Sequence, residues 1–247
     1  MMHSIVGKFS IAALVLAAAS TTSQASVLFL NHVGSVGATV QYPVGGAQDN
    51  QNVGANCWTF DANLGANAGL SALVPGSTLA TFCIEGTQDV YPNRNTTFPT
   101  LISDLGLAPV GGHGSDLQKF WDAYYDSSSG SAVNSAAFQL GVWEIVYDGG
   151  SGGLGTGTFT ASALANNANS AGAVAQATAW LAGLSTATAS NHYQLYVLTS
   201  PRYQDQLFGV PSAGANIAVA PIPLPSALGM GMSLIGGLLL ASRLRRR

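Results

Sequence analysis

One interior stretch of the chain, SAAFQLGVWEIVYDGG at residues 135–150, constrains the fold most, because so long an apolar run must be buried. Phe138, Val142 and Ile145 recur in it at helical spacing. The Asp-Gly-Gly sequence at the end of the run is a typical helix stop. A serine and an asparagine shortly before the run can cap the start of the helix. These features predict a buried helix over residues 134–148, although its β-branched residues weakly favour a strand.

Gln139 lies in the middle of this apolar run. A buried carboxamide without hydrogen-bond partners costs about 1–3 kcal/mol, so its donors and acceptors need partners. On a helix, Gln139 shares a face with Trp143, one turn later. Two interpretations are open: Gln139 makes ordinary hydrogen bonds, or its carboxamide is a reactant.

The flanking segments predict a mixed fold. Alternating or clustered apolar residues between turn formers predict strands at residues 26–30, 38–42, 77–85 and 193–199. Helical spacing predicts further helices at residues 115–126, where Ser115 and Gln118 form a capping-box pattern, and 169–184. The glycine-rich residues 149–157 predict a mobile loop. The fold class expected is α+β, an antiparallel β-rich domain with two or three packed helices.

The N-terminal residues 1–25 predict an export signal that is cleaved after Ala25. Lys8 supplies a basic start, Phe9–Ala19 an apolar core and Ser23–Ala25 a small-residue cleavage site. The apolar core is too short to span a bilayer, so removal is favoured over retention as an anchor.

The C-terminal residues 216–247 carry a second targeting pattern. The run at 226–242 is uncharged and mostly apolar, and it is long enough to cross a thin bilayer as a helix. Prolines before the run enforce an extended lead-in, and arginines after it favour a cytoplasmic end. These residues are Pro221, Pro223 and Pro225, and Arg243, Arg245, Arg246 and Arg247. A plain single-pass anchor is the simplest interpretation of this pattern.

The order of these parts resembles the PEP-CTERM sorting signal. The motif stands here as IPLPSA, with Leu224 in place of the usual acidic residue, followed by the glycine-containing apolar run and the arginine cluster. The resemblance implies a Gram-negative bacterium with an exosortase-type membrane protease as a partner. That enzyme would cleave near the motif, after an inner-membrane intermediate, and send the protein to the cell surface or the extracellular matrix.

Between these ends, residues 26–215 form the expected exported domain. Arg94, Lys119 and Arg202 are its basic residues, against eleven acidic residues, which gives a net charge of about −8. Such a surface excludes nucleic acid and anionic lipid as natural partners. The four histidines are scattered along the sequence, so we expect no metal site, and no motif indicates a cofactor.

The two cysteines, Cys57 and Cys83, allow a disulfide, which is the default expectation in an exported chain. In the chain-entropy description such a bond contributes roughly 3 kcal/mol. This expectation rests on the number of cysteines and on the compartment alone.

Two short motifs within residues 78–148 resemble those of the thioester domains of bacterial surface adhesins. The first is Phe82-Cys83-Ile84, and the second runs from Phe138 to Trp143, with Gly141 where that family favours alanine. The resemblance implies that Cys83 supplies a thioester sulfur and Gln139 the acyl group, with loss of ammonia. It also implies capture of an amine-bearing surface or matrix polymer.

Neighbouring residues would form the pocket of this thioester. Apolar side chains would exclude water, and two glutamates would orient donors beside the cysteine and the glutamine. The residues expected there are Phe82, Phe138, Trp143, Tyr147, Glu85 and Glu144. We therefore expect a surface or biofilm-matrix protein that is not an enzyme. The alternatives are a non-catalytic adhesion domain with a Cys57–Cys83 disulfide and, third, a secreted glycoside hydrolase that uses the two glutamates.

Overall fold

The computed structural model describes residues 28–44, 47–63, 78–86, 101–104, 110–199 and 204–212. The expected signal peptide at 1–25 and the expected sorting segment at 216–247 lie outside these residues.

In the described part of the chain, six antiparallel strands form one sheet with the order β1-β2-β3-β6-β5-β4. Their bounds are β1 Leu28–Val44, β2 Ala47–Asn63, β3 Thr78–Cys83, β4 Leu101–Asp104, β5 Tyr193–Thr199 and β6 Gln206–Pro211. The first two strands form a long hairpin, paired from Leu28 with Asn63 to Val44 with Ala47. Strand β3 is central, because it pairs with β2 on one side and with β6 on the other.

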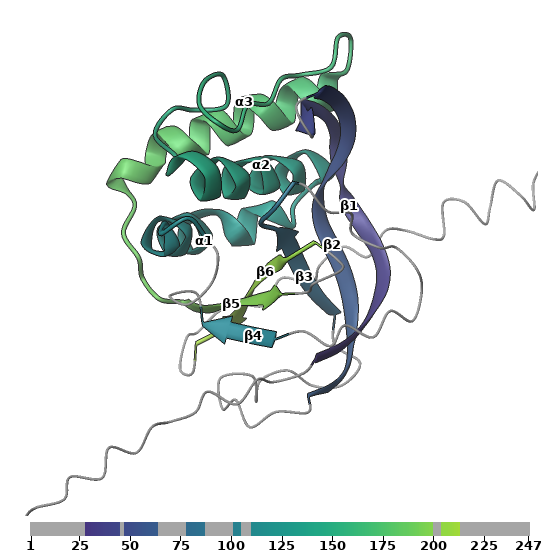
Figure 1. Cartoon of the computed structure of the whole chain (residues 1–247), viewed down its shortest axis with the longest axis vertical. Coiled ribbons are helices and arrows are strands. Elements are labelled where there is room, and N and C mark those ends of the chain that lie inside the picture. Colours follow the sequence, from purple (N-terminus) through teal and green to yellow (C-terminus); the bar gives the residue numbers. More distant parts are fainter. Residues whose placement is uncertain are drawn as a thin grey trace, which may run out of the picture.

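Three α-helices in the described residues pack beside this sheet: α1 Gly114–Ser128, α2 Ala132–Asp148 and α3 Ala168–Gly183. Figure 1 shows α2 between α1 and α3, with the curved β1–β2 hairpin alongside and the shorter strands below. Helix α2 contacts both other helices and strands β1, β2 and β3. The α+β class expected from the sequence is confirmed.

Helix α2 is the predicted buried helix, and every residue from Ser135 to Val146 is buried. Ser131 caps its start by accepting the N–H of Asn134 at 3.0 Å. Gly149 ends it with φ 70°, a left-handed conformation that favours glycine. Burial on all sides outweighs the weak preference of β-branched residues for strands.

The predicted capping box of α1 is wrong. The helix begins at Gly114, and its N-cap residue is His113, which makes no side-chain cap hydrogen bond. Gln118 instead donates to the carbonyl oxygen of Tyr193 at 2.9 Å, so its side chain joins the helix to β5. The Gln118 side chain therefore makes a tertiary contact, and not the hydrogen bond at the helix start that the local sequence pattern predicts.

Residues 28–30 and 38–42, from two predicted strands, belong to one strand, β1, and the prediction at 193–199 coincides with β5. The sequence did not reveal β2, β4 or β6. Strand β2 is rich in Asn, Gln and Ala and has no clear alternation of apolar residues. Its pairing with β1 along the whole hairpin compensates for this weak local preference.

An aromatic cluster fills the space between the sheet and the helices. Phe138 of α2 is its centre, with ring centroids 4.6 Å from Phe82 of β3 and 5.0 Å from Phe120 of α1. Trp121 of α1 also packs on Phe138 and is 1% exposed. Gly141 is required by this packing, because a Cβ atom there would lie 2.2 Å from Cζ of Phe120.

Candidate functional site

Helix α2 meets the sheet where strands β2 and β3 stop pairing. The β2–β3 register ends at the pair of Asn56 with Thr81. Beyond it on β2, Ala55 donates its backbone N–H to Oγ of Ser135 at 2.8 Å. One helical turn later, Gln139 reaches β3. Ser135 and Gln139 of α2 therefore bind backbone groups of β2 and β3 in the region where the two strands no longer pair.

The carboxamide of Gln139 pairs with the main chain of Cys83. Its Oε1 accepts the N–H of Cys83 at 2.8 Å, and its Nε2 donates to the carbonyl oxygen of Cys83 at 2.7 Å. Since the backbone N–H can only donate and the carbonyl can only accept, the orientation of the amide is defined. Gln139 is 1% exposed, so these bonds satisfy a buried amide.

This pairing places an acyl carbon beside a cysteine. With a C=O bond of about 1.2 Å added to the 2.8 Å hydrogen bond, the amide carbon of Gln139 lies within about 4 Å of the Cys83 nitrogen. The two residues are 56 positions apart in the sequence. The structure therefore brings together the two residues that the motif resemblance pairs.

The sulfur of Cys83 lies beside a different amide, that of Gln206. Gln206 of β6 is the cross-strand partner of Cys83 and donates its Nε2 to Sγ at 3.2 Å. The same Nε2 also donates to the carbonyl oxygen of Gln204 at 3.1 Å, and Oε1 accepts from Oγ1 of Thr81 at 2.7 Å. Side chains alternate along a strand, so Thr81 and Cys83 lie on the face opposite Phe82, which packs on the helices.

No motif in the sequence points to this amide beside the sulfur. Thr81, Gln204 and Gln206 are all buried polar residues, with 0%, 6% and 2% exposure. Thr81 and Gln206 are 125 positions apart in the sequence. No local pattern marks such a cluster, because only the register of β3 against β6 brings it together.

The backbone register also places Cys57 relative to Cys83. Cys57 pairs with Ala80, three residues before Cys83 on the same strand. At about 3.3 Å per residue, this offset is roughly 10 Å along β3. Disulfides join Cα atoms that are about 4.4–6.8 Å apart.

The expected pocket residues divide into two groups. Phe82 and Phe138 are fully buried and contact each other next to the Cys83–Gln139 pair. Trp143 and Tyr147 instead pack on Phe159, with ring centroids at 5.7 Å and 6.1 Å. Tyr147 is 38% exposed, and its hydroxyl accepts the N–H of Gly86 at 3.0 Å, so it covers the end of β3.

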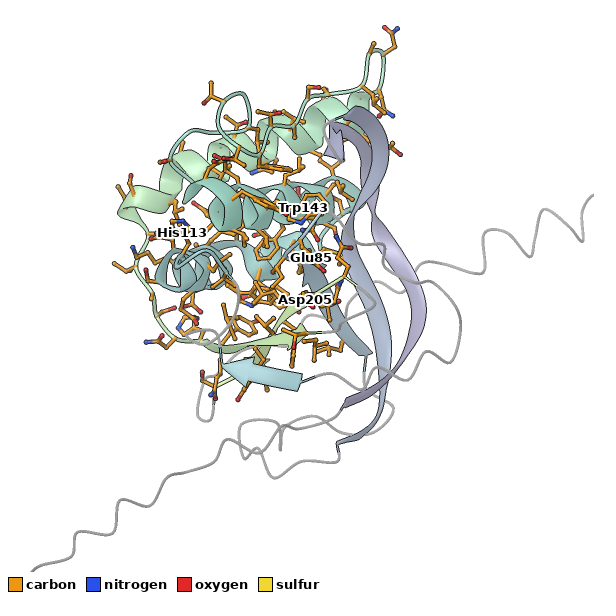
Figure 2. All side chains as sticks on the ribbon, in the orientation of Figure 1. Glu85, His113, Trp143 and Asp205 are labelled. Atoms are coloured by element: carbon orange, nitrogen blue, oxygen red, sulfur yellow. The ribbon has the colours of Figure 1, made fainter. Side chains whose placement is uncertain are left out.

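The two glutamates have different surroundings. Glu85 follows β3, and its Oε1 accepts the N–H of Asp205 at 2.9 Å; Figure 2 shows these two residues together below Trp143. Glu144 has no exposed surface. A glycosidase acid or base must reach its substrate, so a buried Glu144 does not favour the hydrolase alternative.

Burial, together with the nearby charge of Asp148, raises the pKa of the Glu144 carboxyl to about 7. The backbone amides of Gly152 and Gly153 partly oppose this rise. Within the described residues, neither carboxylate oxygen reaches hydrogen-bond geometry with a partner. Glu144 is therefore a buried carboxyl under the glycine-rich loop that follows α2.

Asp148 holds this loop in one conformation, whereas the sequence predicts a mobile loop. Its carboxylate accepts the N–H of Thr158 at 2.8 Å and that of Phe159 at 2.7 Å. Burial favours the neutral acid, but these amide bonds outweigh it and hold the pKa of Asp148 below its usual value. Leu154 and Phe159 of the loop are buried against the helices.

Among the residues that the structure describes, no group of histidine, cysteine and acidic side chains could hold a metal ion. The same residues contain no helix that is both long and apolar enough to cross a membrane. Comparison of the chain with protein-family models, with curated proteins and with solved structures finds no match.

Proposed function

We propose that this protein is an exported surface or matrix protein whose Cys83 and Gln139 form an internal thioester that captures amines. One observation carries the thioester: the carboxamide of Gln139 is buried and held by both main-chain hydrogen-bonding groups of Cys83. These bonds keep the acyl carbon within about 4 Å of the Cys83 nitrogen, and attack requires the Cys83 side chain to turn from Gln206 toward this carbon.

In the proposed reaction the Cys83 sulfur attacks the amide carbon of Gln139. A C–S bond forms, the C–N bond breaks, and the amide nitrogen leaves as ammonia with the thiol proton. The backbone N–H of Cys83 already donates to Oε1, where negative charge develops during attack. In the second step an amine attacks the same carbon, the C–S bond breaks, and the thiol is restored beside an isopeptide bond.

The surroundings of the pair suit a stored acyl group. Cys83, Phe82 and Phe138 are buried, which limits hydrolysis by water. The domain at 26–215 contains one lysine, Lys119, and its ammonium is paired with Asp116 at 2.9 Å. This scarcity of amines limits premature capture by copies of the same chain.

The intact mass of the purified domain tests the thioester. We expect the protein to be one ammonia lighter than its sequence mass, with methylamine adding its own mass at Gln139. Cys83→Ala should abolish both effects, whereas Cys57→Ser should leave both unchanged. A sequence-mass protein that never incorporates methylamine would overturn the proposal.

The second candidate is a non-catalytic adhesion domain in which Gln139 only clamps the sheet. The position of the Cys83 sulfur, beside Gln206 and on the face opposite Phe82, favours this alternative. A Cys57–Cys83 disulfide within it would require the β2–β3 register to change, because Cys57 lies opposite Ala80. A protein two hydrogens lighter than its sequence would indicate that disulfide.

Export and sorting are proposed from the terminal segments alone. We infer cleavage after Ala25, a membrane-inserted intermediate with the helix at 226–242, and processing by an exosortase-type protease near Pro223. The test is the fate of the full chain in a host with and without that protease. Full-length protein that persists in the inner membrane of the complete host would contradict the sorting proposal.

A further inference from the structure

The sulfur of Cys83 and its main chain are held by different amides. Cys83 directs its N–H and C=O to Gln139, away from β6, whereas the next residue, Ile84, donates its N–H to the carbonyl oxygen of Asp205 at 3.0 Å. Cys83 and Gln206 are therefore a non-hydrogen-bonded pair of the β3–β6 ladder, the kind in which side chains lie closest. Gln206 is thus directly beside the sulfur.

The orientation of the Gln206 carboxamide follows from its other partners. The carbonyl oxygen of Gln204 can only accept, so the group facing it at 3.1 Å must be the Nε2 donor. Thr81 donates to Oε1 at 2.7 Å on the other side of the amide. One hydrogen of Nε2 points to Gln204, and the second is available to Sγ of Cys83, 3.2 Å away.

We propose that Gln206 is the positioning residue of the Cys83 sulfur: its amide N–H, fixed by Thr81 and Gln204, holds the sulfur and favours its thiolate form. A donor to sulfur stabilises the anion more than the neutral thiol. The thiolate is the nucleophile, so more of it means faster attack. Basic residues are few in this domain, so the group proposed to stabilise the anion is a neutral N–H donor and not a cation.

The contact between the Gln206 N–H and the sulfur acts in both steps of the proposed reaction. When sulfur attacks Gln139, the N–H of Gln206 increases the population of the attacking anion. When an amine later displaces the sulfur, it stabilises the departing thiolate. This role in catalysis rests on the proposed thioester, whereas the N–H to sulfur contact exists whether or not the thioester forms.

The experiment measures the ionisation of Cys83 directly. In a Cys57→Ser background Cys83 is the one cysteine of the chain, and its S–H stretching band lies in a Raman window with little other protein signal. Each protein is first treated with methylamine, which opens a thioester if one is present and changes nothing otherwise. The loss of the S–H band is then followed as the pH is raised.

We expect the thiolate-to-thiol ratio at a fixed, mildly alkaline pH to fall roughly tenfold in Gln206→Met, which keeps the length of the side chain but removes the donor. Gln206→Glu, with the same shape and an acceptor instead of a donor, should lower the ratio further. Thr81→Val should lower it less, because the amide keeps its donor but loses one anchor. Gln194→Met, an exposed glutamine on the neighbouring strand β5, is the matched control and should change nothing.

Equal ratios in the wild type and in folded Gln206→Met and Gln206→Glu would overturn the proposal. If both Gln206 variants fail to fold, the nearly isosteric Thr81→Val decides, and an unchanged ratio there overturns it too. The mass of each protein before methylamine separates the two proposals. A full sequence mass in the wild type with a changed ratio in the variants would refute the thioester and retain the role of Gln206 on the sulfur.

Discussion

Ser135 and Gln139, one turn apart on α2, bind the main chains of two different strands: Ser135 accepts from Ala55 of β2, and Gln139 pairs with Cys83 of β3. The helix thereby fills the position at which the two strands separate. Backbone groups that would otherwise be buried without partners are satisfied by side chains of the helix. The apolar run is thus attached to the sheet at defined points as well as by packing.

Replacing Gln139 by leucine should lower the free energy of unfolding by about 2–5 kcal/mol, because the N–H and C=O of Cys83 would stay buried without their partner. Ser135→Ala should cost less, about 1–2 kcal/mol, because it removes one acceptor from Ala55. Urea unfolding followed by circular dichroism measures both. Surface substitutions usually change the free energy of unfolding by less than about 0.5 kcal/mol. A decrease as small as that for Gln139→Leu would show that the hydrogen bonds between Gln139 and Cys83 are unimportant for stability.

Glu144→Gln should change how stability depends on pH. The folded state holds the proton of Glu144 up to about pH 7, whereas the unfolded chain releases it near 4.5. The free energy of unfolding of the wild type should therefore contain a contribution that is complete below this window and is lost as the pH rises through it. The variant lacks this loss, so its advantage should grow to roughly 3 kcal/mol above neutrality. Parallel stability profiles for the two proteins would contradict this account.

Gly141→Ala should destabilise the fold by about 1–3 kcal/mol, because the added methyl group would overlap the ring of the buried Phe120. Phe120→Leu in the same chain should recover part of this loss, which a double-mutant cycle would detect. Gly155→Ala is the matched control, since nothing lies within 4 Å of a Cβ atom there. Equal stability of the two alanine variants would mean that the aromatic cluster adjusts without strain.

Asp148→Asn should loosen the loop that follows α2. An asparagine has one acceptor oxygen in place of two, so it cannot accept from both Thr158 and Phe159 as the carboxylate does. Hydrogen exchange at these two amides should accelerate, while exchange in the middle of α2 stays slow. Unchanged protection at Thr158 and Phe159 would show that burial of Leu154 and Phe159 alone holds the loop.

The sequence by itself determined the elements whose cause is local. The apolar run and the glycines after it predict α2, and the alternation at residues 193–199 predicts β5, because burial periodicity and chain breakers act over a few residues. The α+β class follows from the order of these elements. The resemblance of two short motifs suggests the Cys83–Gln139 pair, and in the structure Gln139 contacts the main chain of Cys83.

Only the tertiary structure decided which atoms of these residues meet. That Gln139 binds the main chain of Cys83 depends on where β2 stops pairing with β3, and that Gln206 faces the sulfur depends on the register of β3 with β6. The same holds for β2, whose polar sequence becomes a strand through its long pairing with β1. Register and strand divergence arise from contacts between residues far apart in the chain, so local composition does not predict them.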